Sequence, residues 1–397
     1  MDDPAVNGLQ ADNDPLLAWR KEFPILAHTT YMISHSLGAM PERARTRMAE
    51  YAETWATRGI RAWEEGWWEM PITVGNLIGR IIGAGEGETG MQQNVSVCQS
   101  IVTSCFDWGA KRNKLVTDGL NFPSNNYIYH SLERSGARVV TVPSPDGFTL
   151  PVEDILAAID EETALVSVSH VAFRSSYVQD LAAITRRAHE VGGMVVADLY
   201  QSAGTLPVDV RALGVDFATG GSVKWLCGGP GAGYLYVRRD LWPQLTPAAT
   251  GWMAHEEPFL FDGGPIRYAA DGFRFLNGTP NVPGMYAARS GYEIVNEIGV
   301  PAIRDKSIRQ TERLIALAGE AGFPVRTCRN PAERGGVVVL DVPEGYAVTK
   351  ELARRQILVD FRPRAGIRVA PHFYTTDEEL EYTVSQIRSI VSAGVTA

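Results

Sequence analysis

The sequence has no long apolar run, no cluster of basic residues and no metal-ligand spacing, and each absence narrows the possible function. No stretch reaches the roughly 18 apolar residues that a membrane-spanning helix needs. A net charge of -9 makes nucleic acids and anionic membranes poor partners. Four cysteines and seven histidines are scattered along the chain, which predicts a cytoplasmic protein without a metal site. The acidic segment 1–15 does not resemble a signal peptide, and we expect it to be disordered.

Lysine is also scarce, with six residues against 31 arginines, and one of the six has unusual neighbours. Lys224 lies between Val223 and Trp225, just before a glycine-rich turn, whereas the other five lysines have polar or charged surroundings in the sequence. Apolar surroundings favour an uncharged amine, which is the form that attacks an aldehyde. The alternative is a lysine that extends its charged head from the turn into water.

A carboxylate precedes this lysine by 26 residues. The apolar run 194–197 ends in Asp198, as expected for a buried strand with an acidic residue at its end. A lysine in a turn and a carboxylate at a strand end, both directed into one cleft, are the two groups that pyridoxal phosphate (PLP) requires. The amine forms a Schiff base with the aldehyde, and the acid holds the proton of the ring nitrogen. The sequence therefore predicts a PLP site.

Apolar β-type runs alternate with helical patterns along the chain, which predicts an α/β fold. Runs such as 164–169 are apolar on both faces, as are the strands of a mostly parallel sheet sandwiched by helices. We expect an N-terminal arm and helix in 1–60 that join the small domain, a large PLP-binding domain in 61–295 and a small α+β domain in 296–397. Expected strands are 114–118, 138–142, 164–169, 194–198, 215–219, 233–237, 336–341 and 366–370, and expected helices are 41–57, 94–107, 124–136, 151–161, 178–191, 298–321 and 376–393.

Local patterns suggest four further candidates. Asn94 to Ser96 opens an apolar helix whose N-terminus suits a phosphate, although an ordinary helix cap explains the same pattern. Phe122 follows a strand and is a candidate for stacking on a ring, with core packing as the alternative. Gln201, just past the acidic strand end, is placed to reach the cofactor. Arg368 has apolar neighbours, so it is a candidate either for binding a carboxylate or for a structural salt bridge.

Taken together, these segments resemble the class V family of fold-type I PLP enzymes, and its kynureninase-like members most of all. The resemblance runs from about residue 30 to the C-terminus. Each segment is a weak signal alone, whereas their common order is specific. The segments are 30–41 (TYMISHSLGAMP), 58–63 (RGIRAW), 122–127 (FPSNNY), 197–204 (ADLYQSAG), 207–209 (PVD), 214–217 (GVDF), 251–256 (GWMAHE) and 273–279 (FRFLNGT).

The resemblance implies an amino acid as substrate, a homodimer with shared active sites and a role for each matching residue. It assigns Lys224 to the Schiff base with PLP, Asp198 to the ring nitrogen and Gln201 to the phenolic oxygen. The other implied residues are Phe122 on the ring, Val95 and Ser96 at the phosphate, Trp252 and either Asn277 or Thr279 reaching across the dimer, Arg368 on the substrate α-carboxylate, and Tyr31, His35 and Ser36 near the substrate.

The sequence departs from the family pattern where the reaction is decided. Kynureninases have a tyrosine just before the lysine and other relatives have a histidine, whereas this chain has Val223, which cannot transfer a proton. Kynureninases also have asparagine at position 35 and histidine at position 201, where this chain has His35 and Gln201. Segment 361–366 lacks the nucleophilic cysteine of a cysteine desulfurase. These departures argue against both activities.

We predict a PLP enzyme that acts at the α-carbon of an amino acid, with Lys224 as its acid and base. A lyase that cleaves a C–S or C–C bond to a β-substituent, in a specialised biosynthetic pathway, is favoured. Decarboxylation-coupled deamination, transamination and epimerisation stay open, because sequence does not show how the substrate is oriented. A protein that keeps the PLP fold for binding alone is a different class. A nicotinamide dehydrogenase lacks support, because no GxGxxG motif follows a first strand.

Overall fold

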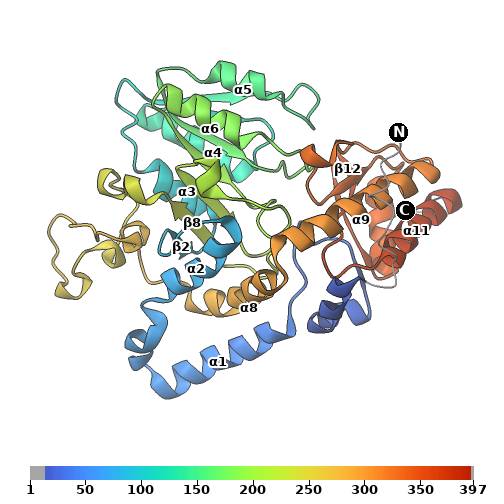
Figure 1. Cartoon of the computed structure of the whole chain (residues 1–397), viewed down its shortest axis with the longest axis horizontal. Coiled ribbons are helices and arrows are strands. Elements are labelled where there is room, and N and C mark those ends of the chain that lie inside the picture. The colour runs from blue at the N-terminus through green and yellow to red at the C-terminus, as the bar shows by residue number, and fades with distance from the viewer. Residues whose placement is uncertain (1–13, 395–397) are drawn as a thin grey trace.

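The computed structural model describes residues 14–394 and places a large and a small β-sheet side by side along the longest axis (Figure 1). Most of segment 1–15, for which we predicted disorder, lies outside the described residues. The prediction is wrong for Asp14 and Pro15, because the Asp14 side chain accepts the Leu16 N–H at 3.0 Å and starts the 3-10 helix Pro15–Glu22. No helix within residues 14–394 is long and apolar enough to cross a membrane.

The large sheet has seven strands in the order β2-β8-β7-β6-β5-β3-β4. Only β8 runs against the others, so the sheet is mostly parallel, as predicted. The carboxyl ends of the parallel strands meet at one edge, which is where ligands collect in such sheets. The strands are β2 (Thr89–Gln92), β3 (Lys114–Asp118), β4 (Arg138–Val142), β5 (Thr163–Ser169), β6 (Met194–Asp198), β7 (Phe217–Gly221) and β8 (Gly233–Val237).

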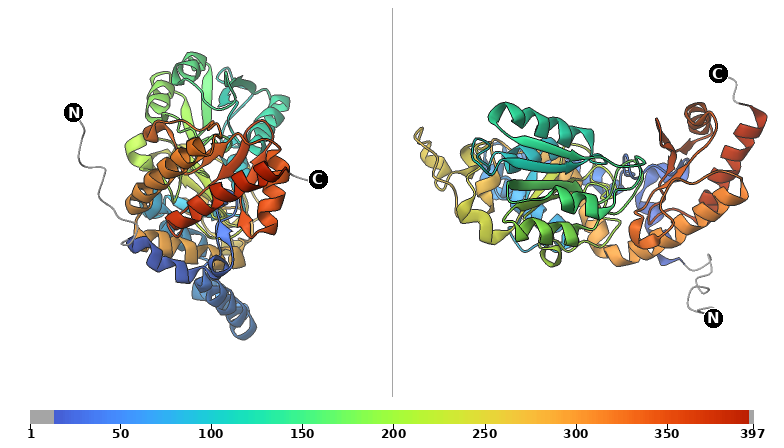
Figure 2. Two further views of the ribbon diagram at one scale, coloured as in Figure 1. Left: turned by 90° about the vertical axis from the view of Figure 1, so that its right-hand side faces the viewer. Right: turned by 90° about the horizontal axis from the view of Figure 1, so that it is seen from above.

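Helices cover both faces of this sheet (Figure 2). Successive residues of β6 show why, since Val195 packs in a core cluster with Ile184, whereas Val196 packs on the other face with Ile101. Strands buried on two faces need the uninterrupted apolar runs seen in the sequence. The helices of this part are α2 (Met70–Ile82), α3 (Val95–Thr103), α4 (Pro123–Ser131), α5 (Val152–Ala158), α6 (Leu181–Glu190), α7 (Val210–Leu213) and α8 (Val282–Ile298).

The small sheet is antiparallel, in the order β11-β12-β9, and has a separate core that includes Leu314, Val338, Ile367 and Leu380. Its elements are α9 (Val300–Glu320), β9 (Val338–Leu340), α10 (Gly345–Arg354), β11 (Asp360–Arg362), β12 (Gly366–Val369) and α11 (Asp377–Ala393).

The N-terminal arm contacts both parts. β1 (Thr30–Tyr31) pairs in parallel with β10 (Ile357–Leu358) beside the small sheet, whereas α1 (Glu42–Arg58) packs along α8 of the large part. Residue 295, our predicted boundary, falls inside α8, which continues to a break at Gly299. The three-part division of the chain stays a prediction.

Several elements differ from the prediction for local reasons. β7 begins at Phe217 instead of 215, because the Asp216 carboxylate accepts the Val195 N–H at 2.7 Å and pairs with Arg238. α3 ends at Thr103 instead of 107, because the hydroxyl of the next residue, Ser104, donates to the carbonyl of Ile101 in the last turn. Helices α2, α7, α8 and α10 were not predicted.

Candidate active site

A cavity of about 140 Å³ lies at the carboxyl edge of the large sheet. Strands β5 and β6 end at Ser169 and Asp198, which are paired neighbours and both line it. Its wall is formed by Phe122, Ser169, Val171, Phe173, Asp198, Tyr200, Gln201 and Lys224. The structure thus brings together four of the residues predicted from the sequence: Lys224, Asp198, Gln201 and Phe122.

Lys224 reaches this cavity from a tight turn after β7. The turn is closed by the N–H of Gly228, which donates to the Ser222 carbonyl at 2.8 Å. The N-terminal arm packs onto the turn at Gly38, whose N–H donates to the Val223 carbonyl at 2.7 Å. A larger residue does not fit there, because a Cβ at position 38 would lie 2.1 Å from the Lys224 carbonyl oxygen.

The amine of Lys224 lies among aromatic rings. Its Nζ is 4.2 Å from the ring centroid of Tyr200 and 5.7 Å from that of Phe122. Burial lowers the pKa of the amine to about 8, an effect that Asp198 opposes and Arg368 reinforces. The residue keeps some accessible surface because it faces the cavity. An appreciable fraction of the amine is therefore uncharged near neutral pH.

Two other lysines correct the prediction that only Lys224 has an apolar setting. Lys114 and Lys306 are each 5% exposed. Each is paired with a carboxylate at 2.8 Å, Lys114 with Asp160 and Lys306 with Asp14. Lys224 has no carboxylate within 4 Å among residues 14–394. What distinguishes Lys224 is therefore burial without a close ion pair.

Asp198, the last residue of β6, is buried and held by two donors. Its Oδ1 accepts the backbone N–H of Tyr200 at 2.8 Å, and its Oδ2 accepts from Nδ2 of Asn125 at 2.8 Å. Burial raises the pKa of this carboxyl, while the two hydrogen bonds and Lys224 act in the opposite direction. A carboxylate offers about four lone-pair positions. Asp198 can therefore accept a further proton-bearing group without losing its support.

Gln201 links the cavity wall to the N-terminal arm. Its Nε2 donates to the His35 carbonyl at 3.1 Å, and its Oε1 accepts the indole N–H of Trp225 at 3.0 Å. One N–H and one lone pair of the amide remain for a ligand. The imidazole of His35 is fully buried, and burial lowers its pKa to about 4, so the ring is neutral at pH 7.

Arg368 is 2% exposed and its guanidinium is engaged by protein groups. Its Nε donates to Oδ1 of Asp360 at 2.7 Å, its Nη2 donates to Oδ2 of Asp360, and its Nη1 donates to the Phe173 carbonyl. Asp360 faces Arg368 across the β11–β12 pair. The structural salt bridge, one of our two interpretations of Arg368, is thus present. A role for Arg368 in binding the substrate carboxylate stays a prediction.

The N-terminal arm contributes three residues that we predicted near the substrate, Tyr31, His35 and Ser36, and none of them lines the cavity. The Ser36 hydroxyl is 3.4 Å from Oδ2 of Asp360, and Nε2 of His35 is 3.2 Å from Oδ1 of the same carboxylate. The Tyr31 hydroxyl donates to the Leu37 carbonyl at 2.9 Å. His35 and Ser36 therefore border the site through Asp360 and Gln201, whereas Tyr31 bonds within the arm.

The predicted phosphate end is the first turn of α3. Oδ1 of Asn94 accepts the N–H of Val97 at 3.1 Å, so Asn94 is the helix cap. Val95 is buried, whereas Ser96 is exposed in the first turn. The N–H groups of a first helical turn have no partner inside the helix and attract anions. Binding of phosphate by Val95 and Ser96 stays a prediction.

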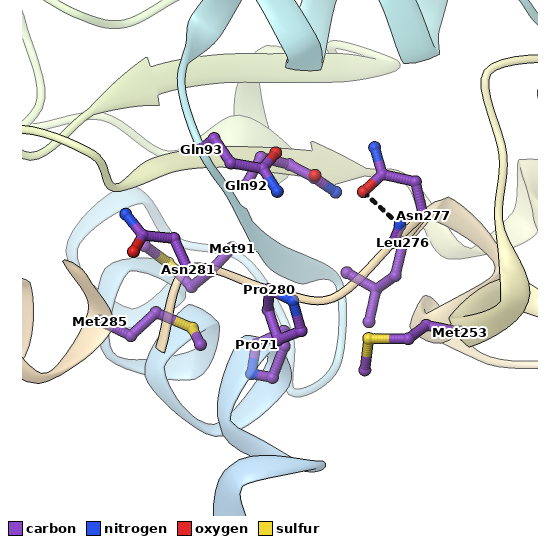
Figure 3. Close-up of a pocket in the computed structure, with 11 residues that line it drawn as sticks. Pro71, Met91, Gln92, Gln93, Met253, Leu276, Asn277, Pro280, Asn281 and Met285 are labelled. Atoms are coloured by element: carbon purple, nitrogen blue, oxygen red, sulfur yellow. Dashed lines mark hydrogen bonds between the residues drawn. The ribbon is translucent and has the colours of Figure 1, made fainter. Parts of the chain in front are cut away.

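The three residues predicted to act across a dimer do not line the cavity of Lys224 in a single chain. Asn277 lines a second cavity, of about 10 Å³, together with Gln92, Gln93 and Asn281 (Figure 3). Its Oδ1 accepts the N–H of Gly278 at 2.8 Å. Thr279 is exposed, and Trp252 is 37% exposed. Their predicted role depends on a second copy of the chain.

Sequence reasoning missed several residues that form or support the site. Tyr200 and Asn125 lie inside the segments that carry the resemblance, and they hold Lys224 and Asp198, respectively. Phe173 follows β5 as Phe122 follows β3, which is a signal that could have found it. Asp360 has no local signal, because only the pairing of β11 with β12 brings it to Arg368.

The residues present fit PLP. A partly uncharged amine, a buried carboxylate with open lone pairs and three aromatic rings face one cavity, and a helix N-terminus is the expected phosphate site. With the mostly parallel sheet and its two helical layers, these features define a fold-type I PLP-dependent enzyme. The sequence matches the family described as Aminotransferase class-V over residues 88–383, and the chain belongs to that family.

Individual relatives cover nearly the whole chain. An uncharacterized aminotransferase, YcbU, of Bacillus subtilis (strain 168) is 32% identical over 93% of this chain and 96% of its own length. A kynureninase of Pseudomonas fluorescens is 31% identical over 92% of this chain and 90% of its own length. The apo structure of a cysteine desulfurase from Thermococcus onnurineus NA1 has a TM-score of 0.86 at 22% identity, covering 96% of this chain and 99% of that one. This last likeness concerns the fold.

Proposed function

We propose that the protein is a lyase that uses PLP to remove a β-substituent, through C–S or C–C cleavage, from an amino acid. The observation that carries this proposal is the buried amine of Lys224, which shares one cavity with Asp198 and has no close ion pair among residues 14–394. When bound, PLP supplies an electron sink for the bond that breaks at the α-carbon.

In this proposal Lys224 carries the cofactor, and Asp198 holds the proton of its ring nitrogen. Asn125 and the Tyr200 N–H fix the carboxylate in place, each at 2.8 Å. Phe122 lies against the ring, and Gln201 offers its remaining N–H to the phenolic oxygen. Val95 and Ser96, at the start of α3, hold the phosphate.

Proton movement at the substrate falls to Lys224. The Val223 side chain has no group that can donate or accept a proton. Burial raises the pKa of the Tyr200 phenol to about 12, so the phenol stays protonated. Asp198 is engaged with the cofactor in our proposal. Among the described residues that line the cavity, one amine is thus left as acid and base, which supports one-base lyase chemistry over an epimerisation that uses two bases.

Transamination is the second candidate, because one relative at 32% identity is named an aminotransferase. It uses the same amine to move a proton within the substrate, so the described residues suit both reactions. The kynureninase at 31% identity supports the lyase. The specialised biosynthetic role and the cytoplasmic location stay predictions.

We also propose that the protein is a homodimer with shared active sites. An aromatic group consisting of Trp68, Trp252, Phe259 and Phe261 has ring centroids 4.8 to 6.0 Å apart in its closest pairs. Phe259 is 61% and Phe261 73% exposed. Exposed aromatic rings of this number are typical of protein interfaces. Asn277 and Thr279 lie in the same part of the sequence as these rings. In a dimer formed through this surface, Asn277 and Thr279 of one copy would reach the cavity of the other copy.

Reduction with borohydride followed by peptide mapping tests the assignment of Lys224. The cofactor should be fixed on the peptide that contains Lys224, and attachment to any other residue would overturn the proposal. In a separate sample of the unreduced, PLP-loaded enzyme, candidate amino acids are added, and release of pyruvate, sulfide, carbon dioxide and ammonia is measured. Transfer of the amino group to a keto acid, without loss of a β-substituent, would select the aminotransferase. A protein that binds PLP but converts no amino acid would be a binding protein.

A further inference from the structure

Two arginines contact Phe173, one of the residues that line the cavity, and two more lie in the hairpin of β11 and β12. The guanidinium carbon of Arg174 lies 5.6 Å from the Phe173 ring centroid, and Nη1 of Arg368 donates to the Phe173 carbonyl. Arg362 is the last residue of β11, and Arg364 lies in the turn that leads to β12 and Arg368. We call Arg174, Arg362, Arg364 and Arg368 the arginine cluster.

The arginine cluster has far more positive than negative charge. Its one carboxylate within 4 Å, among residues 14–394, is Asp360, which holds the fork of Arg368 and lies 3.1 Å from Nη2 of Arg362. Arg174 and Arg364 form no ion pair in that range. Four guanidinium groups against one carboxylate leave an excess of three positive charges. Grouped like charges are unfavourable unless an anion binds among them.

An α-carboxylate alone does not account for this excess. Arg368 is the residue expected to bind it, yet both donors of its fork already face Asp360. Arg174 and Arg364 are not used by any contact of the proposed reaction. Arginine forks bind carboxylates and related oxyanions through two parallel hydrogen bonds, so free guanidinium groups suit a second acidic group.

The path from the reacting amine to the arginine cluster is apolar. Nζ of Lys224 lies 5.7 Å from the Phe122 ring, whose edge-to-face partner is Phe173 at 5.2 Å. The guanidinium carbon of Arg174 lies over the Phe173 ring, 5.6 Å from its centroid. An amino acid that reacts at Lys224 can therefore lay the carbon chain of its side chain along Phe122 and Phe173, with a polar group at its far end.

We propose that Arg174, Arg362 and Arg364 bind an acidic group at the end of the substrate side chain, so that the substrate is an α-amino acid with an anionic side chain. This proposal rests on the proposed function, because it places the α-amino group at Lys224. Asp360 has a positioning role: it holds the fork of Arg368 toward Phe173 and pairs with one edge of Arg362, which leaves Arg174 and Arg364 without a carboxylate partner among residues 14–394.

Matched amino acids test the proposal on the PLP-loaded enzyme. L-aspartate, L-glutamate and L-2-aminoadipate are each compared with their side-chain amides, and binding is followed by the change in cofactor absorbance. Each pair has nearly the same shape and differs in one charge. For the side chain of matching length, we expect the acid to bind at least about tenfold more tightly than the amide. If no acid binds more tightly than its amide, the proposal is wrong.

Variants locate the effect. Arg174→Gln and Arg362→Gln should each weaken binding of the acid about tenfold and leave the amide unchanged. Arg354→Gln is the matched control, because the Arg354 side chain is 75% exposed on α10 and its one ion-pair partner among residues 14–394 is Glu351. Equal effects of Arg174→Gln on acid and amide, or an equal effect of Arg354→Gln, would show an ordinary solvated basic surface and refute the proposal.

A measurement without amino-acid chemistry separates this proposal from the proposed function. Glutarate has two carboxylates and butyrate has one, and neither can react with the cofactor. Calorimetry should show tighter binding of glutarate than of butyrate, and Arg174→Gln should abolish the difference. Equal binding contradicts the arginine site. Failure of borohydride to fix the cofactor on Lys224 would instead refute the proposed function and leave the glutarate result standing.

Discussion

Replacing Lys224 with methionine should stabilise the protein after PLP is removed, and the gain should depend on pH. The pKa of the amine falls from 10.5 to about 8 because the folded chain desolvates it. That fall corresponds to about 3.4 kcal/mol against the charged form. Since Lys224 faces a cavity that admits water, this value is an upper limit. We expect Lys224→Met to raise the free energy of unfolding at pH 7 by roughly 1–3 kcal/mol.

The sign of the pH dependence follows from proton linkage. Below pH 8 both the folded and the unfolded chain carry the charge, so the full cost of burying it is present. Between pH 8 and pH 10.5 the unfolded chain keeps a proton that the folded chain has released, so the stability of the unmodified protein rises with pH. The advantage of Lys224→Met should therefore shrink across this window.

Urea denaturation of both proteins at pH 7, 8, 9 and 10 measures this difference. The change in packing caused by methionine adds a term that does not vary with pH, so the variation with pH isolates the charge. Lys111→Met, at an exposed lysine, is the control and should give no trend of this size. A Lys224→Met advantage that is the same at pH 7 and pH 10 would show that the amine is not desolvated, and the account of its reactivity would fail.

Three further predictions concern the surroundings of the site. Asn125→Ala removes the 2.8 Å hydrogen bond to Asp198, and dialysis monitored by cofactor absorbance should show PLP lost about tenfold more readily, whereas unchanged retention would mean that this bond is dispensable. Asp360→Asn leaves Arg368 without its buried countercharge, so urea denaturation should show that the free energy of unfolding falls by roughly 1–4 kcal/mol. Butyrate should bind this variant more tightly, because the fork of Arg368 is released, and weaker binding would contradict the conclusion that Asp360 occupies that fork. Phe261→Ser should leave monomer stability nearly unchanged and shift sedimentation from dimer toward monomer, and an unaltered dimer would exclude this residue from the interface.

The large sheet and the core of the site could be predicted because their signals are local. The strands of a covered parallel sheet must be apolar on both faces, and this pattern located β3, β4, β5, β6 and β8. Asp198 ends such a strand, and its place at the carboxyl edge follows from the parallel order. Lys224 was found through its apolar neighbours. The family comparisons confirm the class and the cofactor that these residues predicted.

The rest of the site depends on contacts between distant segments, which local patterns do not encode. Gly75 and Gly79 weaken the helical signal of α2, although Gly75 is needed because a Cβ there would lie 1.9 Å from the Thr89 carbonyl oxygen. Apolar flanks also failed as a criterion for burial, since Lys306 is buried through its pairing with Asp14. Asp360 became visible only through the register of β11 with β12.

These distant contacts form a continuous series of hydrogen bonds beside the cavity. Gln201, on the large part, donates to the His35 carbonyl in the N-terminal arm, and the His35 ring contacts Asp360 of the small sheet. Asp360 holds Arg368, which returns to the large part at the Phe173 carbonyl. The series begins and ends in the cavity wall, at Gln201 and Phe173, and connects that wall to the arm and to the small sheet. In our proposal, the position of the small sheet therefore determines where the arginine cluster meets the substrate. The hydrogen bonds that join the two parts of the fold are also the ones that fix the residues around the site.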